Sequence, residues 1–149
     1  MHRLTAVVFV VLACFLAAPV AAQARVTFES RFFPPSAKPG DEVVLELDVE
    51  VEEGFHVYGK KDPSEPLTVK LVDAQGLVAV GEPDFPDGDA HTAFGETNYW
   101  LGGSFKWKQK YTVPATATGE LRVAAMLRYI ACNESFCDPP AKEAFSVKL

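Results

Sequence analysis

Two cysteines near the C-terminus have the residue type and spacing that redox chemistry needs. Cys132 and Cys137 flank four residues, and an aspartate and two prolines follow the second cysteine. Such a pair could bridge the two arms of a hairpin. The third cysteine, Cys14, lies in the N-terminal segment. If that segment is removed on export, an even pair remains, which favours a disulfide.

The cysteine pair has more than one chemical interpretation. A structural bridge over about six residues would stabilise the fold by roughly 2 kcal/mol, which a domain with a large core hardly needs. A short, accessible bridge can also be easily reduced and exchange with other thiols, so both interpretations stay open. Zinc binding with His56 and His91 lacks the usual paired spacing. We therefore expect no metal and no other cofactor.

Carboxylates lie beside the pair in the sequence, at Glu134 and Asp138. Nearby negative charge disfavours a thiolate. The hypothesis is that neither thiol is strongly acidic in the free protein, so that docking of a partner positions and activates the pair.

The first 24 residues have the three parts of a secretory signal peptide. A short basic start precedes the apolar run at residues 4–20, and small residues precede a cleavage site after Ala24. Retention as a membrane anchor and lipidation at Cys14 are the alternatives. Residues 25–149 then form one domain, in which no second apolar stretch is long enough to span a bilayer.

The charge balance excludes some classes of partner. The net charge is −6 at pH 7, and there is no basic patch suited to nucleic acid or an anionic membrane surface. The lysines at 106, 108 and 110 alternate with other residues, as expected for the solvated face of one strand.

Apolar and polar residues alternate along most of the domain, with frequent turn residues between the runs. The pattern predicts clear strands at 41–52, 105–113 and 121–129, and weaker ones at 26–32, 55–58, 67–72, 77–80 and 144–149. Seven to eight short strands without a helical stripe indicate an all-β, immunoglobulin-like β-sandwich. Residues 81–103 are rich in glycine, proline and aromatic residues. We interpret them as an ordered loop packed on the domain, with an extra edge strand as the alternative.

Three segments resemble one known family. Residues 129–140, which contain both cysteines, resemble the active-site segment of the N-terminal periplasmic (alpha) domain of the thiol:disulfide interchange protein DsbD. Residues 54–58 resemble that family's glycine–aromatic strand, and residues 94–96 resemble its cap loop. The resemblance extends over essentially all of residues 25–149. One departure is the spacing of the cysteines, since the DsbD domain has five residues between its cysteines and this sequence has four.

The resemblance implies a redox-active disulfide on an immunoglobulin-like sandwich. Cys137 would form the mixed disulfide with partners and Cys132 would resolve it. The cap and the pocket around the pair would be formed by Phe94, Gly95, His56, Tyr58, Tyr129 and Phe136. This implies a periplasmic oxidoreductase-type module that exchanges electrons with thioredoxin-like proteins.

The expected partners follow from the same resemblance. The acceptors would be periplasmic disulfide isomerases or proteins of cytochrome c maturation. The sequence ends at Leu149, so we expect a stand-alone domain whose membrane-linked electron donor acts in trans. The competing hypothesis is an exported immunoglobulin-like binding or adaptor domain with a purely structural disulfide, in which Phe94, Tyr99 and Trp100 form the binding surface.

Overall fold

The computed structural model describes residues 24–149, whose regular structure is entirely β. The strands are β1 (Val26–Phe33), β2 (Glu42–Val51), β3 (Val57–Tyr58), β4 (Thr68–Asp73), β5 (Val78–Asp84), β6 (Asp89–Ala93), β7 (Glu96–Leu101), β8 (Gly103–Thr112), β9 (Arg122–Tyr129) and β10 (Ala141–Lys148). The segment that carries Cys14 lies outside the described residues, so the signal peptide stays a prediction. Within residues 24–149 there is no helix of the length and hydrophobicity needed to cross a membrane.

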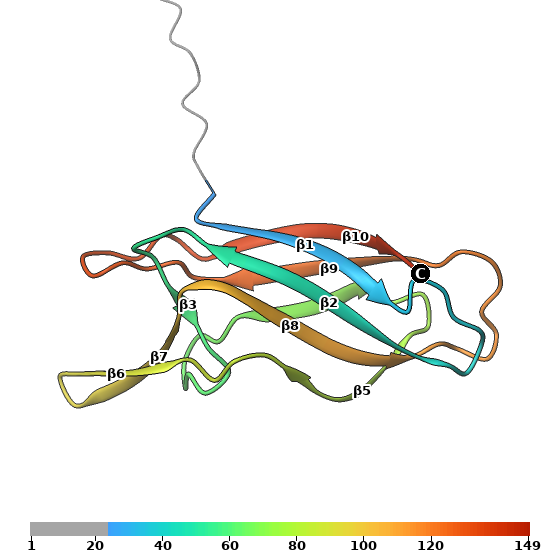
Figure 1. The fold of residues 1–149 in the computed structure, drawn as a ribbon, viewed down its shortest axis with the longest axis horizontal. Coiled ribbons are helices and arrows are strands. Elements are labelled where there is room, and N and C mark those ends of the chain that lie inside the picture. The colour runs from blue at the N-terminus through green and yellow to red at the C-terminus, as the bar shows by residue number, and fades with distance from the viewer. Residues whose placement is uncertain (1–23) are drawn as a thin grey trace, which may run out of the picture.

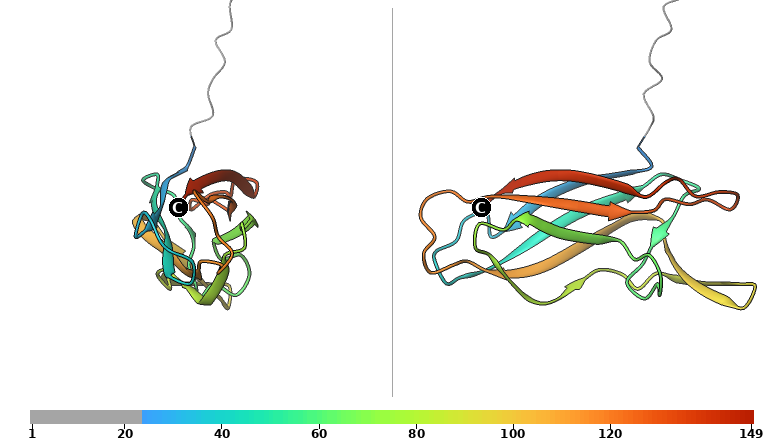
Figure 2. Two further views of the ribbon diagram at one scale, coloured as in Figure 1. Left: turned by 90° about the vertical axis from the view of Figure 1, so that its right-hand side faces the viewer. Right: turned by 180° about the vertical axis from the view of Figure 1, so that it is seen from behind.

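The strands form three antiparallel sheets, with the orders β1-β2-β8-β5, β10-β9-β4 and β3-β7-β6. The first two sheets pack face to face as an elongated sandwich (Figure 1; Figure 2). The third contains the β6–β7 hairpin, which projects from one end of the sandwich. The loop between β9 and β10 projects from the same end (Figure 1).

The core lies between the two larger sheets, where the alternation of the sequence placed it. The inward residues of β2 are fully buried, and so is the inward row of β9. Trp107 of β8 is 1% exposed and is the largest fully buried side chain. The sequence did not predict Gln109, a buried polar residue on the same strand. Its amide donates to the carbonyls of Val80 and Gly81, where the pairing of β5 with β8 shifts register.

The two lateral sides of the sandwich differ. On one side β1 and β10 lie next to each other, and the rings of Phe28 and Phe145 meet edge to face with centroids 5.1 Å apart. On the other side β4 and β5 are the edge strands of their sheets. Both contain irregularities, since β4 shifts register between Leu71 and Asp73, and β5 between Val80 and Asp84.

The all-β fold class is confirmed, but the described chain has ten strands instead of seven to eight. The difference arises in residues 81–103, where the expected ordered loop is instead largely the β6–β7 hairpin. The alternative interpretation, an extra strand, was therefore the better one. Ala93 pairs with Glu96 across a two-residue turn. Phe94 and Gly95 both have positive φ, 53° and 85°, as a type I′ hairpin turn requires.

Candidate functional site

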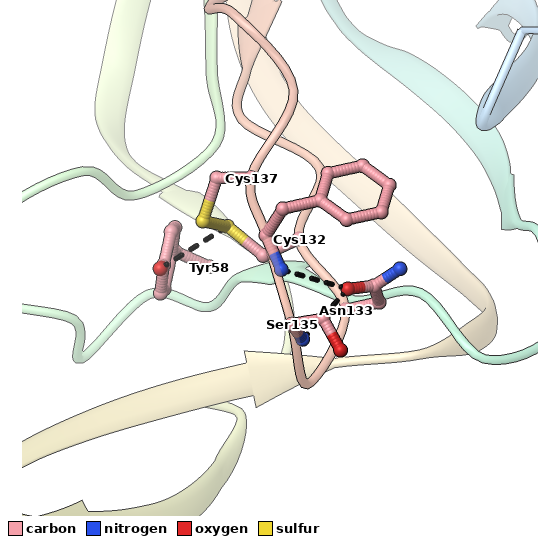
Figure 3. Close-up of a disulfide and its surroundings, with 6 residues drawn as sticks. Tyr58, Cys132, Asn133, Ser135 and Cys137 are labelled. Carbon is pink, nitrogen blue, oxygen red and sulfur yellow. Dashed lines mark hydrogen bonds between the residues drawn. A yellow bond between two sulfur atoms is a disulfide. The ribbon is translucent and has the colours of Figure 1, made fainter.

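A disulfide joins Cys132 and Cys137 at the end of the molecule from which the β6–β7 hairpin projects (Figure 3). The two sulfur atoms have unequal surroundings. Cys132 is 2% exposed, whereas Cys137 is exposed to solvent. A disulfide reacts by attack on one of its sulfur atoms, so a reacting thiolate from outside reaches Cys137 far more easily than Cys132.

Hydrogen bonds hold the cysteine loop in a narrow hairpin. Cys132 and His56 exchange both backbone hydrogen bonds, at 2.8 and 2.9 Å, so Cys132 is fixed to the segment before β3. The side-chain oxygen of Asn133 accepts hydrogen bonds from the backbone N–H groups of Ser135 and Phe136 (Figure 3). This Asx-type turn reverses the chain between the cysteines and brings Cys137 back to Cys132.

The side chain of Tyr58 contacts the buried sulfur of Cys132. Its hydroxyl lies 3.4 Å from Cys132 Sγ (Figure 3). A disulfide sulfur has no proton, so the hydroxyl is the donor in this oxidised state. Burial raises the pKa of Tyr58, and the nearby carboxylates of Asp62 and Glu65 raise it further. The hydroxyl therefore keeps its proton well above neutral pH and stays available as a donor.

Asp62 is a buried carboxylate that the sequence analysis did not single out. It is 5% exposed and accepts hydrogen bonds from the backbone of Ser64, Glu65 and Tyr99 and from the Ser64 hydroxyl. Burial opposes its ionisation, but these bonds together lower its pKa below the usual value. Asp62 thereby fixes the segment after Tyr58 to β7. The aspartate-proline-serine sequence was the one local signal for such a turn.

Two histidines enclose a tryptophan beside the disulfide. The rings of His56 and His91 stack on Trp100, each with a centroid separation of 3.8 Å. His56 also meets Tyr58 edge to face. Burial lowers the pKa of His56, and the neighbouring His91 lowers it further. The stack connects the β6–β7 hairpin to the residue that holds the backbone of Cys132. Sequence analysis could not predict this, because the three residues come from separate segments.

The aromatic residues predicted at the site occupy different places. Phe94 lies at the tip of the β6–β7 hairpin beside Gly95 and is fully exposed, so it does not cover the disulfide in this conformation. Phe136 is half exposed and meets Phe55 edge to face. Tyr129 is buried, and its hydroxyl donates to Glu143 of β10. Burial and this carboxylate raise the pKa of Tyr129.

The two carboxylates beside the cysteines differ in their partners. Asp138 lies 3.4 Å from the guanidinium of Arg25, which also pairs with Glu52. Glu134 is exposed and has no basic partner within 4 Å among residues 24–149. In the same part of the chain, no three histidine, cysteine, aspartate or glutamate side chains gather as metal ligands would.

The fold and the site define a class of protein, an immunoglobulin-like β-sandwich that presents one exposed cysteine of a disulfide at its end. Comparison with protein families gives the particular family. Residues 23–149 match the family described as "Thiol:disulfide interchange protein DsbD, N-terminal", and the chain belongs to it. This family is periplasmic. A comparison with curated proteins found no match.

Solved structures of related domains resemble the chain. The N-terminal periplasmic domain of ScsB from Proteus mirabilis is 12% identical with a TM-score of 0.54, over 90% of this chain and 49% of that one. The chain thus spans about half of that structure, and the likeness supports the fold. The reduced N-terminal domain of DsbD from Neisseria meningitidis is 24% identical with a TM-score of 0.48, over 74% of this chain and 77% of that one.

Proposed function

We propose that this chain is a periplasmic thiol–disulfide exchange module, exported by a cleaved signal peptide, that passes electron pairs between thioredoxin-like proteins through Cys132 and Cys137. Membership of the family supports the exchange function. The observation that carries the assignment of roles is the unequal exposure of the cysteines, with Cys137 exposed and Cys132 buried. In the reduced domain Cys137 attacks the disulfide of the acceptor, and in the oxidised domain it is the sulfur that the donor attacks. Cys132 resolves the mixed disulfide.

Electron transfer to an acceptor takes two displacements. The Cys137 thiolate attacks one sulfur of the acceptor disulfide, whose bond breaks, and the released acceptor thiolate takes up a proton. The Cys132 thiolate then attacks Cys137 Sγ in the mixed disulfide and releases the second acceptor thiolate. The acceptor has gained two electrons and two protons, and the domain now holds the Cys132–Cys137 bond.

Reduction of the domain runs through the same atoms in reverse. A donor thiolate attacks exposed Cys137 Sγ, and Cys132 leaves as a thiolate. The second thiolate of the donor then attacks the donor sulfur of the mixed disulfide, which releases Cys137 as a thiolate and leaves the donor oxidised. A better-stabilised leaving thiolate leaves faster. The Tyr58 hydroxyl, which already contacts Cys132 Sγ, is placed to donate to the negative charge that forms there. His56 holds Cys132 in position through its backbone.

The cap function predicted for Phe94 requires the hairpin to move toward Cys137, because Phe94 is fully exposed in the present conformation. If such a closed state is populated, Phe94→Ala should speed reduction of the disulfide by dithiothreitol. An unchanged rate would leave Phe94 with the role of a contact residue for partners.

The reduction potential tests the proposal against a structural disulfide. Equilibration with glutathione and dithiothreitol buffers should give a value between about −120 and −270 mV, the range of exchange proteins. A value below about −300 mV would indicate a structural bridge and favour a binding domain. With periplasmic extract, Cys132→Ser should accumulate mixed disulfides through Cys137. Cys137→Ser, which retains only the buried cysteine, should form few, and equal trapping by both variants would contradict the assigned roles.

A further inference from the structure

The end of the sandwich that carries the disulfide is called the redox end here. Two segments project from it, the β6–β7 hairpin and the cysteine loop between β9 and β10, and each carries an exposed aromatic ring and an exposed carboxylate. On the β6–β7 hairpin these are Phe94 and Glu96, two positions apart. On the cysteine loop they are Phe136 and Glu134, also two positions apart. Aromatic rings are enriched at protein interfaces relative to the rest of the surface. Cys137 is exposed on the same loop, so a partner that reaches its sulfur must approach these tips.

The charges at this end are mostly unpaired carboxylates. Glu53, Asp89, Glu96 and Glu134 are exposed and have no basic side chain within 4 Å among the described residues. Two of the nearby cations are paired with carboxylates. Arg25 pairs with Glu52 and Asp138, and Lys61 pairs with Asp87. Lys60 donates only to the carbonyl of Pro83, and Lys142, just after the cysteine loop, is exposed with no carboxylate within 4 Å among the described residues. These four unpaired carboxylates therefore outnumber the two unpaired lysines.

We propose that the redox end selects partners whose disulfide lies in an apolar surface bordered by lysine or arginine side chains. This inference rests on the proposed exchange function and adds the kind of partner. Phe94 and Phe136 provide apolar contact on either projection, and the unpaired carboxylates attract a cationic border. Complementary charge of this kind mainly raises the rate of productive encounter and disfavours partners of the wrong sign.

Three cyclic disulfide peptides test the inference. They share one ring sequence and differ in whether two lysines, two serines or two glutamates flank the ring. In this reaction the reduced chain passes two electrons to the peptide. The peptide disulfide becomes a dithiol, and the chain dithiol becomes the Cys132–Cys137 disulfide. Acid-quenched samples separated by chromatography give the rates. Each rate is divided by that of dithiothreitol with the same peptide, which removes the intrinsic reactivity of the peptide.

We expect the lysine peptide to react about tenfold faster than the glutamate peptide at 10 mM salt. This ratio should fall below about twofold at 1 M salt, where the screening length shrinks from about 30 to 3 Å. Glu96→Gln combined with Glu134→Gln should lower the low-salt ratio to about threefold. The matched control, Glu42→Gln combined with Asp73→Asn, neutralises two exposed carboxylates toward the opposite end that also lack a basic partner within 4 Å among the described residues, and should leave the ratio unchanged.

The outcomes separate this inference from the proposed function. If the serine peptide is not reduced, the exchange function itself fails. If the serine peptide is reduced but the lysine and glutamate peptides react at equal normalised rates, exchange stands and the charge selection is wrong. Equal effects of the two double variants would also overturn it, because the selection would then come from net charge and not from the redox end.

Discussion

Replacing Tyr58 with phenylalanine tests how the fold sets the stability of the reduced cysteines. The substitution keeps the ring and removes only the hydroxyl that lies 3.4 Å from Cys132 Sγ. In the disulfide this bond is made to a weak, neutral acceptor. In the reduced protein above the thiol pKa, the same hydroxyl faces a thiolate, which is a stronger acceptor. Loss of the hydroxyl therefore destabilises the reduced form more than the oxidised form.

The size of the effect follows from the difference between these two bonds. A neutral hydrogen bond contributes about 1 kcal/mol net, and one to a charged group about 2 kcal/mol. The difference, about 1 kcal/mol, corresponds to roughly 20 mV for a two-electron couple. Tyr58→Phe should thus make the reduction potential more negative by about 20 mV at pH 9. The effect should be smaller at pH 7, where less thiolate is present.

Redox equilibration with dithiothreitol buffers at pH 7 and pH 9 measures this shift. The raised pKa of Tyr58 keeps its hydroxyl protonated across this range. Tyr111→Phe is the matched control, since Tyr111 is a buried tyrosine on β8 that pairs with Val43 at the start of β2, far from the disulfide. A potential for Tyr58→Phe that stays the same or becomes less negative would refute the role given to this hydroxyl.

Three further predictions concern the stability of the fold, measured by chemical denaturation. Asp62→Ala leaves several donors without their acceptor and should lower the free energy of unfolding by about 3 kcal/mol. Asp73→Ala, at the exposed end of β4, should lower it by less than about 1 kcal/mol. Equal losses would contradict the role of Asp62. His56 has a lowered pKa when folded, so the unfolded chain takes up the proton first as pH falls through about 6.5, and stability should fall between pH 7.5 and 5. His56→Phe should flatten this dependence, and an unchanged slope would exclude His56 as its source. Leu47→Ala, at a fully buried position, should lower the free energy of unfolding by about 3 kcal/mol. Val72→Ala, at an exposed position, should lower it by less than about 0.5 kcal/mol. Similar losses would show that the core is assigned wrongly.

The sequence predicted the sandwich wherever one face of a strand is buried. In β2, β8 and β9 the alternation of apolar and polar residues follows directly from burial on one side, and the predicted bounds agree with the structure within one or two residues. The β6–β7 hairpin could not be found in this way. All of β6 is exposed, so its residues show no apolar alternation, and its turn places a phenylalanine at positive φ, where glycine or asparagine is the usual signal.

The cysteine pair was predictable from local spacing, but its surroundings were not. Asp62 contacts Tyr99 across 37 positions of sequence, and Tyr58 contacts Cys132 across 74. Contacts of this range depend on how the third sheet packs on the end of the sandwich, and no local pattern encodes them. The family resemblance did place Tyr58 and His56 near the cysteines. It gave no reason to expect Asp62 or the ring of Trp100 between two histidines.

The irregular edge strands bear on self-association. A regular, exposed edge offers a row of free N–H and C=O groups to another chain and so promotes aggregation. In the two large sheets, β1 and β10 lie against each other, while β4 and β5 are interrupted by register shifts. The lateral sides of the sandwich are therefore poor templates for edge-to-edge pairing. Association along these sides would compete with partner binding at the end that carries Cys137, and the irregular edges disfavour it.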